Sequence, residues 1–467
     1  MGFKKIKTIV SKLSKQEKSQ FDSFLDSPFF NPHEKNKQLY HALLPYLNEN
    51  SDKKPPLKEI AQSCGLRPDN SSLSVYMSKL LALVEEFLVQ RELRRETATR
   101  KCLLMQGFAG IECQAMAYSY LSNEKTSPKK QSTKSLLDDF LLKNSHLQAS
   151  QTVQNVKQIS YTYDEVVRSL NTFYLSRILK AYCSKISAKN IYGLGEELDE
   201  SNYLIDLSEN LAAGQHPLSQ LYGHAMLLVK DASENNFYKL SVILDKFHHK
   251  IERSDLSILY LIALNYCIRQ TRSGKSNQDT LFIIISKMVE NNALYEGRYL
   301  PADRMRNIVA IVCDLKKFDW CETFVKKHYH HVHPDFREDA YTFNMGAILF
   351  NQKRFEEAHE MLIKTEIKDL HYEISRRTIL LKIFYELNEE LALVNHAESY
   401  KAFIRKNKSF QKENKKSVIN FINMTVGLYK SKHRYSKTSK EKFAKKINDQ
   451  TAIFSKKWLL QKLDEIK

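Results

Sequence analysis

Histidines are concentrated in one short stretch of this 467-residue chain, KKHYHHVHPD at residues 326–335. Imidazole nitrogens bind zinc and nickel, and the spacing of His328 and His331 places both rings on one face of a helix. His333 is the third candidate ligand, with Asp335 as the nearest carboxylate. The stretch also falls at a boundary between two predicted repeats, where a polar turn is expected. We favour the turn and predict neither a metal ion nor a cofactor.

Motifs of the common enzyme classes are absent from the sequence. It contains no GxxxxGK[ST], GxGxxG, HExxH or GxSxG pattern, which would supply a phosphate cradle, a metal site or a nucleophile. Adjacent carboxylates on a helix diverge, so they do not form an acid–base pair; the pairs of this kind are Glu85–Glu86, Glu356–Glu357 and Glu389–Glu390. We therefore predict that the protein is not an enzyme.

Basic residues are concentrated at the two ends of the chain. Residues 1–20 carry a net charge of +5 and residues 405–467 a net charge of +13, so the middle of this +18 chain is neutral. Such segments bind nucleic acid or other polyanions through phosphate contacts, or they form basic amphipathic helices that cap a fold. We favour the cap. The candidate polyanion contacts are Lys415, Lys416, Lys430, Lys432, Arg434, Lys437, Lys445 and Lys446.

Two adjacent phenylalanines, Phe29 and Phe30, lie between prolines in the stretch SPFFNP. Pro28 disfavours helical geometry at the residue before it, and Asn31 can cap a new helix, so the stretch is a corner between two helices. We predict that at least one phenylalanine fills this corner. The alternative is a hydrophobic knob that contacts a protein partner.

Residues 1–122 are predicted to form a helical N-terminal domain. Ser14 and Glu17 have the spacing of a capping box at the start of one helix. Residues 57–90 resemble a helix-turn-helix, because LKEIAQSCGL is followed by a strongly periodic helix that would enter the DNA major groove. The alternative is a small helical domain without DNA contacts. Residues 123–135 are polar and basic and are predicted to be a linker.

The composition of the chain indicates an all-α protein. Glycine and proline number only 12 and 10, too few for the turns of a β-rich protein of this length. Seven cysteines occur without CxxC spacing, which indicates reduced core cysteines. No signal peptide follows the basic N-terminus, and no apolar run reaches about 20 residues, so we expect a soluble cytoplasmic protein with no membrane partner.

The most informative pattern is a repeat in the second half of the chain. Residues 344–362 align with residues 307–325 at an offset of 37, and residues 381–400 follow at an offset near 35. The segment 344–362 resembles a tetratricopeptide (TPR) repeat. It places Gly346 and Ala358 twelve residues apart, where two helices must touch closely.

The whole chain also resembles a bacterial family of all-helical, repeat-containing proteins, through LSKQEKSQFDSFLDSPFFN, MSKLLALVEEFL, LNTFYLSRILKAYC and WLLQKLDEI. The resemblance implies a helical repeat fold and attaches no activity to it. We therefore predict a TPR-like α-solenoid over residues 136–404, followed by a basic helical segment at 405–467. The expected function is a scaffold that binds a protein or peptide on its repeat surface. The alternative is a nucleic-acid-associated regulator acting through residues 57–90 or 405–467.

Overall fold

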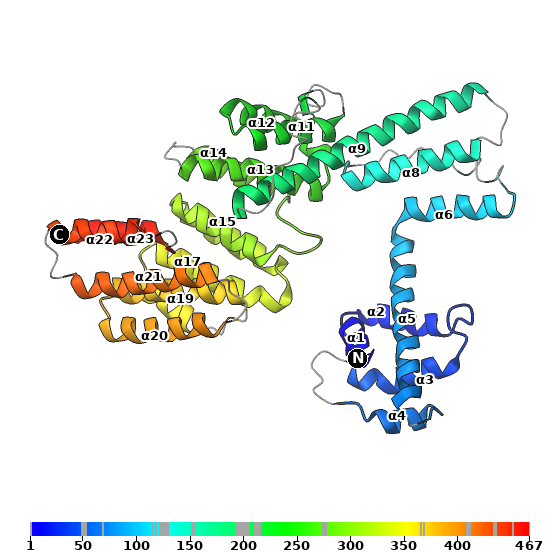
Figure 1. The fold of residues 1–467 in the computed structure, drawn as a ribbon, viewed down its shortest axis with the longest axis horizontal. Coiled ribbons are helices and arrows are strands. Elements are labelled where there is room, and N and C mark those ends of the chain that lie inside the picture. The colour runs from blue at the N-terminus through cyan, green and yellow to red at the C-terminus, as the bar shows by residue number, and fades with distance from the viewer. Residues whose placement is uncertain are drawn as a thin grey trace. The chain divides into compact units, whose positions relative to one another are not determined.

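The chain is built from helices (Figure 1). In the described residues the only other regular elements are two isolated bridges, so the predicted all-α class is confirmed. The chain divides into two compact units, residues 1–128 with 134–174, and residues 129–133 with 175–467. The computed structural model describes residues 2–47, 54–67, 70–113, 116, 120, 130–150, 156–192, 206, 208–209, 216–272, 278–364, 367, 369–407, 412–432, 437–450 and 453–466.

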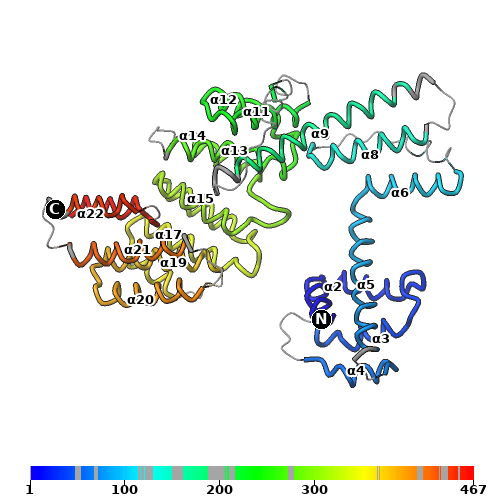
Figure 2. The backbone as a smooth tube through the Cα atoms, in the orientation of Figure 1, coloured from blue at the N-terminus to red at the C-terminus, as the bar shows by residue number. Residues whose placement is uncertain are grey.

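The first unit is organised around the long helix α5 (Asn70–Arg95), which Figure 2 traces past the N-terminal helices. A buried face of α5 repeats at three- and four-residue intervals and packs against α1, α2 and α3; it carries Leu73, Met77, Leu80, Val84 and Phe87. The other helices of the unit are α1 (Gly2–Val10), α2 (Lys15–Leu25), α3 (Glu34–Leu43), α4 (Leu57–Ser63), α6 (Thr97–Gly110), α8 (Thr133–Ser150) and the part of α9 (Val156–Tyr192) before residue 175.

Helix α2 begins as the sequence predicts, whereas α3 does not. The side chains and backbone N–H groups of Ser14 and Glu17 form the reciprocal hydrogen bonds of a capping box. Asn31 was expected to cap α3, but the helix begins three residues later. The amide of Asn31 instead donates to the carbonyl of Leu25 at 2.9 Å, and its oxygen accepts from Asn36 at 2.9 Å. Asn31 therefore ties the end of α2 to α3.

The second unit is a series of helix pairs. From α15 onward, each first helix contacts its own partner and also the first helix of the next pair: α15 contacts α16 and α17, α17 contacts α18 and α19, and α19 contacts α20 and α21. The helices are α11 (Pro217–Lys230), α12 (Glu234–Phe247), α13 (Arg253–Arg272), α14 (Gln278–Glu290), α15 (Ala302–Asp314), α16 (Phe318–His328), α17 (Arg337–Asn351), α18 (Phe355–Ile363), α19 (Leu370–Glu386), α20 (Glu390–Lys406), α21 (Lys412–Ser431), α22 (Lys437–Asn448) and α23 (Lys456–Glu465).

The turn inside the pairs α15/α16, α17/α18 and α19/α20 has one recurring geometry. Lys316, Lys353 and Asn388 lie in the left-handed region, with φ of 57°, 66° and 58°. In each turn the next residue donates its backbone N–H to the carbonyl five residues earlier, as in a Schellman C-cap; the pairs are Lys317 to Val312, Arg354 to Leu349 and Glu389 to Phe384. These turns follow one another after 37 and 35 residues, which are the offsets of the sequence repeat.

Gly346 allows close contact between α17 and α18. A Cβ atom at this position would lie 2.7 Å from Cγ and Cδ2 of Leu362, which is fully buried, so the added atom would force the packed core to shift. We expect Gly346→Ala to lower the free energy of unfolding by about 1–3 kcal/mol, the cost of overpacking a core. Urea denaturation of the purified variant measures this change.

The control is Gly427→Ala in α21, where the new Cβ would make ordinary contact with Phe443 at 3.7 Å. Because alanine is the better helix former by about 1 kcal/mol, this variant should be neutral or stabilised. The same loss in both variants would mean that Gly346 is not required by helix contact.

The unit boundaries differ from the predicted domain boundaries. Residues 136–174, which include most of α8 and the first part of α9, lie in the predicted repeat region, 136–404, but belong to the first unit. Helices α21, α22 and α23 were predicted to form a separate segment, but they group with the repeats. No described helix is both long enough and apolar enough to cross a membrane.

Only the last part of the predicted linker, residues 130–135, lies in the described residues. Residues 123–129 lie outside the described residues. Gln131, however, pairs with the strand-like segment before α13: its N–H donates to the carbonyl of Lys250 at 2.6 Å, and its carbonyl accepts from Glu252 at 2.7 Å. Backbone pairing therefore fixes the last part of this segment in the second unit.

Candidate partner-binding site

A cleft of about 530 Å³ lies in the second unit, where three successive first helices begin. Its walls come from residues 299–303 at the start of α15, from residues 332–336 before α17, and from residues 369–372 at the start of α19. These segments are about 35 residues apart in the sequence. They meet because α15, α17 and α19 lie next to one another in the stack, with their first residues at the same end.

Carboxylates and aromatic rings line this cleft. Asp303 is exposed in the first turn of α15, and Glu296 pairs with Arg304 at 2.6 Å. Asp369 caps α19 by accepting the backbone N–H of Tyr372 at 2.9 Å. The rings are those of Tyr299, Phe336 and Tyr372. An apolar surface edged by negative charge suits a cationic segment with an apolar anchor.

Tyr372 fixes one wall of the cleft. Its hydroxyl donates to the carbonyl of Ala302 at 2.5 Å and accepts from the amide of Asn344 at 3.4 Å. Its ring meets the ring of Phe343 edge-on at 5.0 Å, and the guanidinium of Arg306 lies 5.3 Å from its centroid. Burial raises the pKa of Tyr372, so the hydroxyl stays protonated and keeps donating. These contacts hold the start of α19 against the start of α15.

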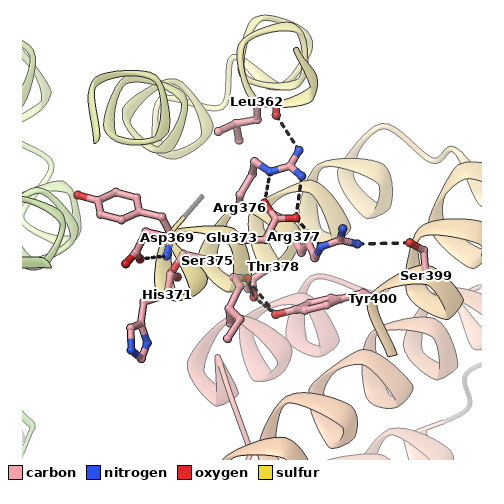
Figure 3. Close-up of polar contacts among 12 residues, drawn as sticks. Leu362, Asp369, His371, Glu373, Ser375, Arg376, Arg377, Thr378, Ser399 and Tyr400 are labelled. Carbon is pink, nitrogen blue, oxygen red and sulfur yellow. Dashed lines mark hydrogen bonds and ion pairs between the residues drawn. The ribbon is translucent and has the colours of Figure 1, made fainter. Parts of the chain in front are cut away.

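The residue after Tyr372, Glu373, forms hydrogen-bonded ion pairs with two arginines of the same helix (Figure 3). Glu373 accepts from Arg376 at 2.7 and 2.8 Å and from Arg377 at 2.6 Å. Arg376 also donates to the carbonyl of Leu362 in α18 at 3.0 Å, and Arg377 donates to the hydroxyl of Ser399 in α20 at 3.3 Å. The three charged side chains are only 10, 14 and 19% exposed. The network therefore fixes α19 between α18 and α20.

The predicted histidine stretch forms two 3-10 turns between α16 and α17. His328 is buried, with Nδ1 2.9 Å from the hydroxyl of Tyr295, and the exposed ring of His331 lies 5.4 Å from the ring of Tyr295. His333 lines the cleft, 4.8 Å from the ring of Tyr299. In the described ranges, no three histidine, cysteine, aspartate or glutamate side chains are grouped to hold a metal ion.

His328 makes stability depend on pH. Burial, with the charges of Lys327 and His331, lowers the pKa of His328 from 6.5 to about 4. Between these values the unfolded chain binds a proton that the folded chain does not, so stability is full above pH 6.5 and falls as the pH drops toward 4. The loss is about 3 kcal/mol. Urea denaturation across this pH range measures the change. In His328→Gln the free energy of unfolding should depend less steeply on pH than in the wild type. In His330→Gln, a variant of an exposed residue, the pH dependence should be unchanged.

The basic C-terminal segment packs onto the repeats through α23. The ring of Trp458 lies 5.2 Å from that of Tyr385 in α19, and the ammonium of Lys462 is 2.9 Å from Glu386. The ammonium of Lys382 lies 5.4 Å from the Trp458 ring, and burial lowers the pKa of Lys382 to about 8. Helix α23 therefore packs against α19, and the interpretation of the whole segment as a helical cap stays a prediction.

The candidate polyanion contacts have different environments. Lys432 donates to Asn388 at 2.6 Å, and Lys415 donates to the carbonyl of Arg405 at 3.4 Å. The side chains of Arg434 and Lys437 lie outside the described residues. The exposed candidates are Lys416, Lys430, Lys445 and Lys446.

The two phenylalanines of the corner are not equivalent. Phe30 stacks on Phe24 in α2, with ring centroids 4.5 Å apart, so Phe30 fills the corner. Phe29 touches Phe30 edge-on but is 87% exposed. Phe29 therefore has the exposure that a partner-facing knob requires.

The predicted helix-turn-helix corresponds to α4 and α5, which six residues separate. Gly65 in this connection has φ of 61°. The apolar face of α5 is occupied by α1, α2 and α3, so DNA contact would need another face of the helix. In the described residues, α5 makes the contacts of a helix at the centre of the first unit, with α1, α2 and α3 packed on its apolar face.

A second carboxylate network, which no sequence pattern indicated, lies at the start of α13. Asp255 is completely buried and accepts from the ammonium of Lys180 at 2.9 Å, the hydroxyl of Tyr222 at 2.5 Å and the backbone N–H of Thr133 at 2.9 Å. Lys180 also donates to the Thr133 hydroxyl at 3.1 Å. Burial raises the pKa of Tyr222, which keeps its hydroxyl a donor. The network holds residues 130–133 against α13.

No protein-family model, curated protein or solved structure matches this chain. The resemblance to a bacterial helical-repeat family therefore stays a prediction, and the candidate site rests on the geometry of the chain itself.

Proposed function

We propose that the protein is a non-enzymatic scaffold whose TPR-like helix pairs bind a protein segment in the cleft between the starts of α15, α17 and α19. The bound segment carries a basic residue beside an apolar anchor. The observation that supports this most is the cleft itself, which combines aromatic walls with three carboxylates, Glu296, Asp303 and Asp369.

Two further observations support a repeat scaffold. The turns at Lys316, Lys353 and Asn388 share one geometry. From α15 to α21 each first helix contacts the next, which is how stacked repeats build a continuous core. All seven cysteines are free, which fits a reducing cytoplasm. A cytoplasmic location is therefore part of the proposal.

Photo-crosslinking at the cleft tests the proposal. Phe336 is 38% exposed on the cleft wall, so benzoylphenylalanine can replace it with little disturbance. After irradiation of the cells that make the protein, we expect a crosslinked segment with lysine or arginine next to a large apolar residue. The charge-reversing change Asp303→Lys should remove this product.

The control position is Tyr238 in α12, which is 67% exposed and does not line the cleft. The same product from both positions would contradict the proposal. So would an acidic captured segment, or a product that survives Asp303→Lys.

A second candidate function is nucleic-acid-associated regulation through the C-terminal segment. It is supported by four exposed lysines on α21 and α22: Lys416, Lys430, Lys445 and Lys446. If this candidate is right, labelled duplex or single strands bind the protein with an affinity that falls steeply with salt. Replacing the four lysines with glutamine should then reduce the slope, and no binding at low salt would exclude it.

A further inference from the structure

A groove of about 520 Å³ lies between α2 and α5 in the first unit. Its floor is aromatic: Phe24 stacks on Phe30 at 4.5 Å and meets Phe87 of α5 edge-on at 5.7 Å. Phe29 follows directly and touches Phe30 at 5.0 Å while remaining 87% exposed. The corner between α2 and α3 therefore places the ring of Phe30 in the groove and the exposed ring of Phe29 next to it.

The rim of the groove is basic. Arg91 donates to Glu17 at 2.9 Å, and hydrogen bonds from Ser14 with the charge of Arg91 lower the pKa of Glu17, which keeps this pair ionised. Arg95 is 60% exposed, donates to Glu92 at 3.0 Å and lies 3.8 Å from the carboxylate of Glu17. Arg94 also lines the groove, is exposed, and makes no ion pair with the described residues. The groove is therefore lined by three guanidiniums and one carboxylate, that of Glu17.

We propose that this groove binds an acidic segment of a partner protein that carries an aromatic or large aliphatic anchor. The anchor would occupy the floor formed by Phe24, Phe30 and Phe87, with Phe29 packing against its outer side. The carboxylates of the segment would meet Arg94 and the exposed guanidinium of Arg95, since arginine and carboxylate pair in a bidentate geometry.

A nucleic acid fits this groove less well than an acidic peptide. A phosphate backbone needs a track of unpaired cations, whereas Glu17 already engages Arg91 and lies near Arg95. More of the exposed lining of the groove is apolar than polar. A peptide with few charges around one anchor matches both features.

The experiment is a selection of displayed random peptides on the full-length protein, with counter-selection against the double variant Phe29→Asp, Arg94→Glu. Both residues are exposed and lie outside the core, so the variant should fold as the wild type does. The surviving peptides should be rich in aspartate and glutamate around one aromatic or aliphatic residue. One of them, labelled, should bind wild type and lose at least about tenfold in affinity for the variant.

Val75→Asp serves as the matched control, since Val75 is a half-exposed apolar residue of α5 that does not line the groove. This change should leave the affinity unaltered. The proposal is overturned if no peptides survive the counter-selection, if the survivors are basic, or if Val75→Asp weakens binding equally. It is also overturned if labelled single-stranded DNA binds wild type, fails to bind the double variant and outcompetes the peptide. These outcomes leave the proposal for the cleft unaffected, because they concern different residues.

Discussion

Replacing Glu373 with glutamine is expected to lower the free energy of unfolding by about 3–5 kcal/mol, the range for removing one partner of a buried ion pair. Glutamine has nearly the same shape but no charge, so two guanidiniums, at Arg376 and Arg377, would lose the only carboxylate that pairs with them among the described residues. Neither arginine side chain can turn easily into solvent, because Arg376 is hydrogen-bonded to α18 and Arg377 to α20. Urea denaturation of the second unit's transition measures the loss.

The matched control is Glu360→Gln, which removes a carboxylate from an exposed pair with Lys364. An exposed pair of this kind contributes at most about 1 kcal/mol, so little change is expected. The double variant Glu373→Gln, Arg377→Gln should recover part of the loss, because it removes one of the uncompensated charges. A Glu373→Gln protein as stable as the wild type would show that the network does not hold α19 in place.

Replacing Asp255 with asparagine should have an effect of similar size, about 3–5 kcal/mol. The carboxylate is fully buried and accepts three donors, including the ammonium of Lys180, which is itself only 15% exposed. Asparagine removes the charge and turns an amide N–H₂ toward either the ammonium of Lys180 or the backbone N–H of Thr133, which only donate, so at least one donor loses its acceptor. Because the backbone of Thr133 is one of the donors, residues 130–133 should detach from α13.

Limited proteolysis separates this local effect from global loss of stability. Asp255→Asn should speed trypsin cleavage after Lys130, while Asp245→Asn should not, since Asp245 forms an exposed pair with Lys287. The double variant Asp255→Asn, Lys180→Met should recover stability by removing the uncompensated cation. Cleavage after Lys130 at the wild-type rate would contradict the role assigned to Asp255.

The sequence predicted local features better than distant contacts. The offsets of 37 and 35 residues correspond to the turns at Lys316, Lys353 and Asn388, because a turn is decided by residues close together in the chain. Gly346 was expected at a close helix contact, and it lies against Leu362. Both features leave a pattern of residue types at fixed spacing.

The cleft and the two carboxylate networks left no such pattern. The cleft brings together segments about 35 residues apart whose residue types differ, and the bond from Thr133 to Asp255 spans 122 residues. In the sequence, three of the carboxylates look like ordinary helix-start or surface residues: Asp303, Asp369 and Glu373. Only the packing of the helix pairs shows what they contact. The grouping of α8 with the first unit has the same cause, since it depends on tertiary contacts.

The most direct measurement is the affinity of the full-length protein for the segment captured at Phe336, compared between Asp303→Lys and Asp319→Lys. Both aspartates are exposed in the first turn of a helix, α15 and α16, so reversing their charge costs the same in helix-dipole energy. Only Asp303 lines the cleft. We predict at least about tenfold weaker binding for Asp303→Lys and unchanged binding for Asp319→Lys. Equal affinity of the two variants would contradict a cleft that binds a basic segment.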